Sequence, residues 1–155
     1  MDGEGREDGR WRMEDGEVKM DNGVGLGWRT DMGAIGSFRE LEVYRFAREG
    51  AKEVFELSKG FPGTEKYALT DQIRRSSRAV GAMIAEAWAR RRYEAAFINK
   101  LNEALGEAME TQAWLDSALD CTYIDQAAHG QHDDRWQRVG GMLARMIEKA
   151  SSFCG

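Results

Sequence analysis

The strongest constraint on the fold is an apolar repeat between residues 97 and 118. Seven residues there are spaced by four, three, four, three, four and three positions: Phe97, Leu101, Ala104, Ala108, Thr111, Leu115 and Ala118. Such spacing forms the seam of a helix that packs along its neighbours at a crossing angle of about 20°. The sequence therefore predicts an all-α protein built as a helical bundle.

Apolar periodicity elsewhere in the chain predicts three further helices. Pro62 is the only proline among the 155 residues, whereas folds rich in strands and turns use proline often. The expected helices lie at about 38–59, 70–88, 94–121 and 126–150. A reversal is placed near 89–93, because one helix from 70 to 121 would be too long to pack in a domain of this size. We expect an antiparallel, up-down-up-down four-helix bundle over residues 37–150.

Local signals mark where helices begin and end. Ser37 and Glu40 have the spacing of a capping box, in which each side chain accepts a hydrogen bond from the other residue's backbone amide. The segment 60–63 combines glycine with Pro62 and ends the first helix. Thr70, followed by Asp71, is the expected N-cap of the second helix.

Residues 1–33 differ in composition from the remainder of the chain. They contain eight of the 18 glycines and nine acidic residues against five basic ones. We found no apolar period in this segment that would offset the entropy of ordering it. It is predicted to be a disordered tail rich in glycine and acids.

The chain contains no run of about 20 apolar residues and no signal peptide pattern. Its two cysteines, Cys121 and Cys154, have no spacing typical of a disulfide framework or of a zinc site. These features favour a cytoplasmic protein that is not inserted in a membrane.

Few residues in the sequence are suited to catalysis or to metal binding. Metal-binding bundles use Glu-x-x-His pairs, and the sequence has none. His129 and His132 lie in a polar stretch around Gly130 and are interpreted as solvated side chains rather than as a ligand pair. We therefore expect no metal, no cofactor, no catalytic residue and no enzymatic activity.

Glu86 is the acid with the most apolar sequence neighbours, since Ile84, Ala85, Ala87 and Trp88 surround it. A buried carboxylate must be paired or protonated. We expect a structural ion pair, with Arg90 four residues later or with an arginine of another subunit. A ligand-binding role for Glu86 is the alternative.

Charge is distributed unevenly along the second half of the chain. Residues 72–100 carry seven basic and two acidic residues, a net charge of +5, and residues 101–134 carry eight acids and no base. The basic side chains are Arg74, Arg75, Arg78, Arg90, Arg91, Arg92 and Lys100. They would contact either nucleic-acid phosphates or the acidic stretch of a neighbouring subunit. The overall net charge of −5 favours the second interpretation.

The helices carry more apolar surface than one bundle interior should need. The first helix has a second apolar stripe that includes Val43 and Phe46, and Trp114 lies in line with the outward acids of the third helix. The candidate interface residues are Val43, Phe46, Glu103, Glu107, Glu110 and Trp114. Large exposed apolar patches mark interfaces, so we expect a closed homo-oligomer.

Two stretches of the sequence resemble a known family. Residues 61–77, with the sequence Phe-Pro-Gly-Thr-Glu-Lys-Tyr-Ala-Leu-Thr-Asp-Gln-Ile-Arg-Arg-Ser-Ser, and the later Ile84-Ala85-Glu86 are similar to bacterial four-helix-bundle proteins. That family was first noticed as reading frames inside intervening sequences of large-subunit ribosomal RNA. The segments 37–44 and 97–112 resemble its first and third helices, and the resemblance extends over residues 37–150.

The resemblance implies properties that the residues alone do not. Family members form rings of five bundles, have no enzymatic activity attached to them, and have distant relatives that act as accessory proteins to reverse transcriptases. We therefore expect a non-catalytic homopentameric scaffold that binds a partner macromolecule, RNA or an RNA-handling protein. The alternative is a bundle that binds a small ligand in a pocket near Glu86.

Overall fold

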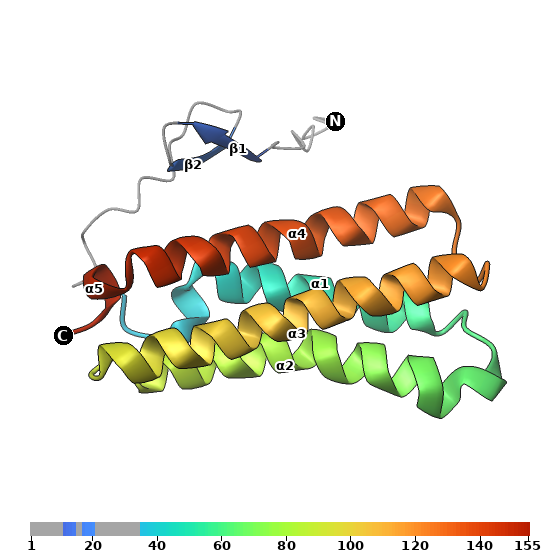
Figure 1. The fold of residues 1–155 in the computed structure, drawn as a ribbon, viewed down its shortest axis with the longest axis horizontal. Helices are drawn as coiled ribbons and strands as arrows, with labels where there is room; N and C mark the ends of the chain where they lie inside the picture. The colour runs from blue at the N-terminus through green and yellow to red at the C-terminus, as the bar shows by residue number, and fades with distance from the viewer. Residues whose placement is uncertain (1–10, 15–16, 21–34) are drawn as a thin grey trace, which may run out of the picture. The chain divides into compact units, whose positions relative to one another are not determined.

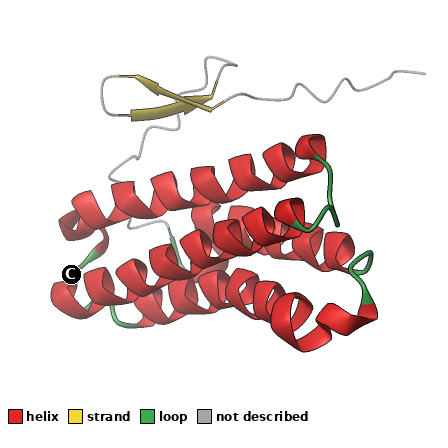
Figure 2. Ribbon diagram, turned by 45° about the vertical axis from the view of Figure 1, so that its right-hand side comes forward, coloured by secondary structure: helices red, strands yellow, loops and turns green. Residues whose placement is uncertain are grey.

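The computed structural model describes residues 11–14, 17–20 and 35–155. The chain divides into two compact units, Met1–Gly33 and Ala34–Gly155. The first contains two short antiparallel strands, β1 (Trp11–Glu14) and β2 (Glu17–Met20), with Trp11 opposite Met20 and Met13 opposite Val18 (Figure 2). Apolar and charged residues alternate along both strands, but four residues are too short a pattern to stand out, and this pair was not predicted. The disorder expected for the other residues of 1–33 lies outside the described residues.

The second unit is a four-helix bundle, as the sequence predicted. Its long helices are α1 (Glu42–Ser58), α2 (Asp71–Ala89), α3 (Glu94–Asp120) and α4 (Gln126–Glu148), and a short α5 (Ala150–Phe153) follows. Each long helix runs antiparallel to the one before it (Figure 1). No helix in the described part of the chain is long and apolar enough to cross a membrane.

The core of the bundle is centred on α3, which packs against both α2 and α4. The buried residues of α3 are the seven of the predicted seam, from Phe97 to Ala118. Ile73, Val80 and Ile84 of α2 and Trp136 and Leu143 of α4 are among the other fully buried side chains. Burying large apolar side chains stabilises a domain by about 1.5–3 kcal/mol each, so this seam explains why the helices associate.

The first helix begins in two steps. A short 3-10 turn, η2 (Phe38–Glu40), precedes Leu41, whose extended backbone separates the turn from α1. The Ser37 hydroxyl accepts from the Arg39 amide at 3.2 Å, and the Glu40 carboxylate accepts from the Gly36 amide at 2.8 Å. The predicted capping box is therefore shifted by one residue at both contacts, because the tighter turn changes which amides face the two side chains.

The second helix also has a different start from the one expected. A 3-10 turn, η3 (Gly63–Glu65), and a π-helical turn, η4 (Lys66–Thr70), lead directly into α2. Thr70 has helical backbone angles and makes no side-chain cap. The prediction of Thr70 as an N-cap was wrong, because the chain is already helical before this residue.

The reversal between α2 and α3 occupies residues 90–93. The Arg90 amide donates to the carbonyls of Glu86 and Ala87, and the Tyr93 amide donates to the Arg90 carbonyl at 2.9 Å. Tyr93 is extended, with φ −115° and ψ 105°, and it ends the turn. This short turn holds α2 and α3 side by side, so residues of the basic and acidic stretches come into contact.

Candidate functional site

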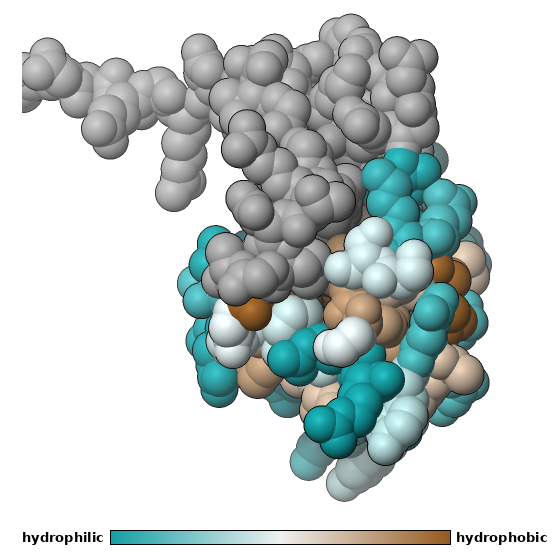
Figure 3. Space-filling model, turned by 90° about the vertical axis from the view of Figure 1, so that its left-hand side faces the viewer, coloured by the Kyte–Doolittle hydropathy of each residue, from teal (hydrophilic) through white to brown (hydrophobic). Residues whose placement is uncertain are grey.

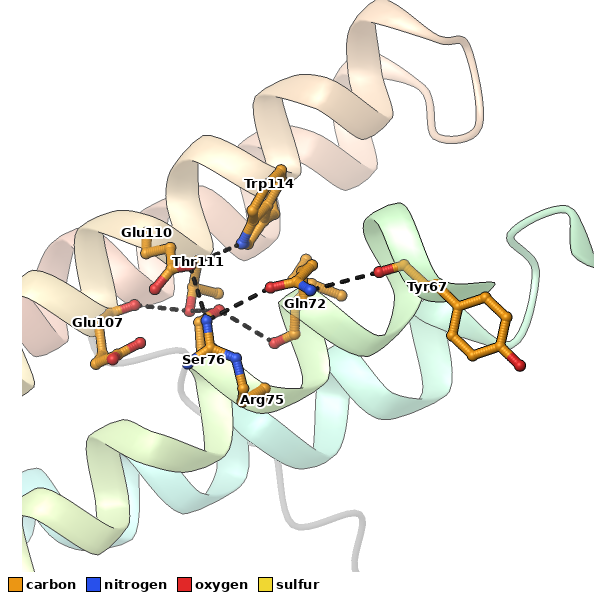
Figure 4. Close-up of polar contacts among 9 residues, drawn as sticks. Tyr67, Gln72, Arg75, Ser76, Glu107, Glu110, Thr111 and Trp114 are labelled. Atoms are coloured by element: carbon orange, nitrogen blue, oxygen red, sulfur yellow. Dashed lines mark hydrogen bonds and ion pairs between the residues drawn. The ribbon is translucent and has the colours of Figure 1, made fainter. Parts of the chain in front are cut away.

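Part of the basic stretch meets part of the acidic stretch inside one subunit. Arg75 of α2 forms an ion pair with Glu110 of α3, with 3.1 Å between Nη2 and Oε1. Trp114 donates from its indole nitrogen to the same Glu110 oxygen at 3.3 Å (Figure 4). The sequence had left only nucleic acid or a neighbouring subunit as partners, and for Arg75 the partner is its own chain.

Glu107 lies beside this ion pair. One of its carboxylate oxygens is buried. Burial raises the pKa of Glu107, the neighbouring Glu110 carboxylate raises it further, and the charge of Arg75 opposes both effects. Next to it the hydroxyls of Ser76 and Thr111 lie 2.8 Å apart in the buried contact between α2 and α3. The hydrogen bond between Ser76 and Thr111 therefore links α2 to α3, whereas the buried Glu107 oxygen has no hydrogen-bond partner among the described residues.

Lys100 has carboxylate partners on both sides. Its amine lies 3.1 Å from Glu86 and also pairs with Glu103. Hydrogen bonds to Glu103 and then to Glu86 raise the pKa of Lys100. This lysine is therefore engaged within its own subunit rather than presented to a phosphate.

The expectation that the Glu86 carboxylate is buried was wrong. Its side chain is 52% exposed, and its partner is Lys100 rather than Arg90. The apolar neighbours along the sequence point elsewhere, since Ile84 and Ala87 turn into the core while the residues on the face of Glu86, Ala82 and Ala89, are exposed. The buried acid proposed at this position does not exist.

The described surface has a hollow at a different place from Glu86, where a ligand pocket was the alternative expectation. This hollow, of about 140 Å³, lies between α1 and α2 and is lined by Tyr44, Ala47, Arg48, Ala51, Ser77, Arg78, Gly81 and Ala82. Glu86 is not among these residues. The hollow exists because its alanine and glycine residues have side chains too small to fill the space between the two helix backbones.

Two further arginines of α2 are held against α1. The Arg74 side chain donates from Nε to the hydroxyl of the buried Ser58 at 2.7 Å, and its guanidinium lies 4.7 Å from the centre of the Phe55 ring. The guanidinium of Arg78 lies 5.5 Å from the centre of the same ring. Both side chains cover Phe55 and make cation–π contacts, in which the positive guanidinium is attracted to the face of the aromatic ring.

The arginines of the turn behave differently from those of the helices. Arg91 lies 4.0 Å over the Trp88 ring and donates to the Trp88 carbonyl at 2.9 Å. Arg90 and Arg92 are exposed and have no ion-pair partner among residues 35–155. Tyr93 follows them with 67% of its surface exposed. Figure 3 views this end of the bundle, where hydrophilic side chains project around smaller apolar areas.

The prediction that Val43 lies at a subunit interface was also wrong, because its side chain is only 1% exposed within a single subunit. Phe46 is half-buried under Arg135, whose guanidinium lies 4.4 Å from the ring centre. Arg135 is itself fixed by two 2.8 Å hydrogen bonds to Glu53. Arg135 of α4 thus covers Phe46, and Val43 is buried within one subunit rather than available to another.

The other interface candidates remain at the surface. Glu103 pairs with Lys100, and Trp114 is half-buried beside Glu110. Three large apolar side chains in the described part of the chain are exposed, and none of them was predicted: Tyr67, Tyr93 and Met109. The period of α3 places Met109 opposite the buried seam, but its neighbours on that face, Gly106 and Ala113, are too small to form an apolar stripe that the sequence would reveal.

The two histidines do not form a pair, but the expectation that they are solvated was wrong, because both are half-buried. The Nε2 atom of His129 lies 2.7 Å from an Asp116 carboxylate oxygen on α3. His132 has a buried Nδ1 atom that makes no hydrogen bond within the described residues, and burial lowers its pKa against the opposing charge of Glu53. Their side chains therefore face different helices, as residues three apart on a helix can when they lie at an edge of its buried face.

Comparison with known proteins agrees with this architecture. A solved structure of a protein of unknown function from the S23 ribosomal protein family of Bacteroides thetaiotaomicron matches with a TM-score of 0.63 and 32% sequence identity. The match covers 68% of this chain and 98% of that one. No curated protein matches the sequence. The profile described as 23S rRNA-intervening sequence protein matches residues 39–145, which include all four long helices except the end of α4. The chain therefore belongs to the 23S rRNA-intervening sequence protein family.

Proposed function

We propose that this chain is a non-catalytic, homo-oligomeric scaffold that binds RNA through the turn between α2 and α3. The observation that carries the proposal is the group of three consecutive arginines, Arg90, Arg91 and Arg92, followed by the exposed Tyr93. We place the protein in the cytoplasm, because both of its cysteines are free thiols.

The turn offers two kinds of contact that RNA requires. Arg90 and Arg92 carry positive charges that no carboxylate within residues 35–155 neutralises by a direct ion pair. Each phosphate that they neutralise releases counterions, which favours binding at low salt. The Tyr93 ring is free to stack on a base, and stacking of this kind is worth about 1–3 kcal/mol per base.

The names of related proteins support RNA as the partner. The description of the family names an intervening sequence of 23S ribosomal RNA, and the description of the Bacteroides protein names a ribosomal protein family. Neither description states what those proteins bind. For this chain, RNA is the partner that best fits an arginine cluster beside an exposed aromatic ring.

A homo-oligomer would carry several copies of the arginine turn. Met109 is 59% exposed on the outer face of α3, between the exposed small residues Gly106 and Ala113, and the half-buried Trp114 flanks them. We propose this strip as the contact between copies of the chain. Five copies is the number that the family resemblance implies. Several copies of the arginine turn on one particle would raise the apparent affinity for a long RNA.

The RNA proposal is tested by removing two charges from the turn. Arg90→Gln combined with Arg92→Gln is expected to weaken binding of a labelled single-stranded RNA about tenfold at low salt, as measured by fluorescence anisotropy. The matched control is Arg48→Gln with Lys52→Gln, which removes the same charge from exposed positions on α1. Equal losses in both variants, or no loss in the turn variant, would reject the turn as the site.

The assembly proposal is tested separately by light scattering of the full chain. Met109→Glu is expected to shift the particle toward the monomer mass of 17.5 kDa while circular dichroism stays unchanged. Ala127→Glu is the control, because it adds the same charge to an exposed position in the first turn of α4, where a helix tolerates acids. A wild-type protein that remains monomeric at high concentration would exclude this interface.

A further inference from the structure

Three side chains with metal-binding atoms come together near the turn that joins α3 and α4. They are Asp116 of α3 and His129 and Asp133 of α4, and one ligand atom from each lies within 4.8 Å of the others. The Asp116 oxygen and His129 Nε2 are already 2.7 Å apart. Asp116 is exposed, while the other two residues are half-buried.

The register of the two helices builds this cluster. His129 and Asp133 are four residues apart, so they lie on the same face of α4. Asp116 faces His129 across the helix contact, and one turn further from the loop Gln112 donates from its amide nitrogen to Asp133 at 3.0 Å. A hydrogen bond of this kind orients a ligating carboxylate, which is the usual role of residues around a metal site.

The local charge is also suited to a cation. In the part of the chain that the structure describes, neither Asp116 nor Asp133 forms an ion pair with a lysine or an arginine, whereas Glu103, Glu110 and Asp134 of the same stretch do. Within the described residues, Asp116 is paired with His129 alone, and Asp133 accepts its hydrogen bond from the neutral Gln112. Because the histidine pairs with one of these two carboxylates and only a neutral amide binds the other, negative charge is left uncompensated.

We propose that Asp116, His129 and Asp133 bind a divalent transition-metal cation of the Zn²⁺ class. His129 Nε2 and one oxygen from each aspartate supply three ligands, and water completes the coordination. Imidazole favours Zn²⁺ and its neighbours over Mg²⁺ or Ca²⁺, which prefer oxygen ligands alone. The cation takes the place of the proton that now joins His129 to Asp116.

The geometry needs only small adjustments to accept the ion. Metal–ligand distances of about 2.0–2.2 Å in a tetrahedral arrangement separate neighbouring ligand atoms by about 3.4 Å. The short contact between Asp116 and His129 therefore opens slightly, and the Asp133 carboxylate moves inward. The exposed Asp116 side chain has the rotamer freedom to do this without moving either helix.

The test titrates the full chain with Zn²⁺ by isothermal calorimetry and with Co²⁺ by visible absorption, in buffer without chelators. The expected result is one ion per chain and an absorption spectrum typical of four-coordinate Co²⁺. His129→Gln and Asp133→Asn are each expected to weaken Zn²⁺ binding at least tenfold. His132→Gln is the matched control, since it removes the other histidine and should leave binding unchanged.

Circular dichroism and thermal melting of every variant show whether it folds, and Asp116→Asn provides a third ligand variant at an exposed position. Loss of binding in Cys121→Ser but not in the ligand variants would assign the ion to the exposed thiol and overturn the proposal. The same conclusion follows if His129→Gln binds Zn²⁺ as tightly as the wild type, if His132→Gln loses binding equally, or if the wild type binds no ion.

Discussion

The basic residues of α2 and α3 and those of the turn between these helices are close in sequence but differ in their surroundings. Arg74 contacts Ser58, Arg75 pairs with Glu110, and Lys100 pairs with Glu86 and Glu103. Arg90 and Arg92 have no such partner among residues 35–155. The comparison shows that charge counted along a sequence does not measure the charge available to a partner, because neighbouring helices neutralise what they carry.

The largest difference is expected between Arg74 and Arg92. Arg74→Gln should lower the free energy of unfolding by about 1–2 kcal/mol, because it removes a charged hydrogen bond to the buried Ser58 hydroxyl and the cover over Phe55. Arg92→Gln should change it by less than about 0.5 kcal/mol. Urea denaturation of both variants measures the difference. Similar losses would mean that the turn arginine also serves the bundle.

A smaller effect is expected inside the contact between α2 and α3. Thr111→Val should cost about 1 kcal/mol, because it removes the hydroxyl that lies 2.8 Å from Ser76. Combining it with Ser76→Ala should restore most of the loss, since both polar groups are then absent from the buried contact. A double-mutant cycle by thermal or urea unfolding gives the coupling. Additive losses would contradict a specific bond between the two hydroxyls.

The smallest effect concerns Glu107, whose pKa is raised in the folded protein by burial and by Glu110. A raised carboxyl pKa contributes stability when the group is protonated, below its unfolded value, and this contribution is lost as pH rises through the folded pKa. Glu107→Gln should therefore stabilise the protein at pH 7 by less than about 1 kcal/mol, since the group is partly solvated. At about pH 3 the two proteins should have equal stability.

Unfolding measured across this pH range tests the assignment. Glu103→Gln is the control, because the Glu103 carboxylate is stabilised by Lys100 rather than opposed by a second acid. It should destabilise rather than stabilise at pH 7. A destabilising Glu107→Gln substitution would show that its charge is needed for the ion pair of Arg75.

The buried seam of α3 was predictable because a single helix determines it. All seven residues of the repeat are buried, since periodicity fixes which side of a helix faces its neighbours. Glu86 was misread for the related reason that its neighbours in sequence lie on other faces of α2. Val43 was misread because the sequence does not show which parts of the second stripe of α1 are buried within one subunit.

Features that depend on two helices were not predictable from the sequence. The pairing of Arg75 with Glu110 and the cluster of Asp116, His129 and Asp133 both require the register between helices, which no local pattern specifies. The starts of α1 and α2 differ for another reason. Short 3-10 and π-helical turns place the first amides where simple capping rules do not expect them.

The most direct test of the account is the salt dependence of RNA binding in two double variants. For wild type, the logarithm of affinity should fall steeply with the logarithm of salt concentration. Arg90→Gln with Arg92→Gln should make that slope shallower by about 1.4, which corresponds to two lost phosphate contacts on a single strand. Arg75→Gln with Lys100→Gln should leave the slope unchanged, because carboxylates of the same subunit already neutralise these side chains. A slope that changes with the helix pair and not with the turn pair would contradict the account.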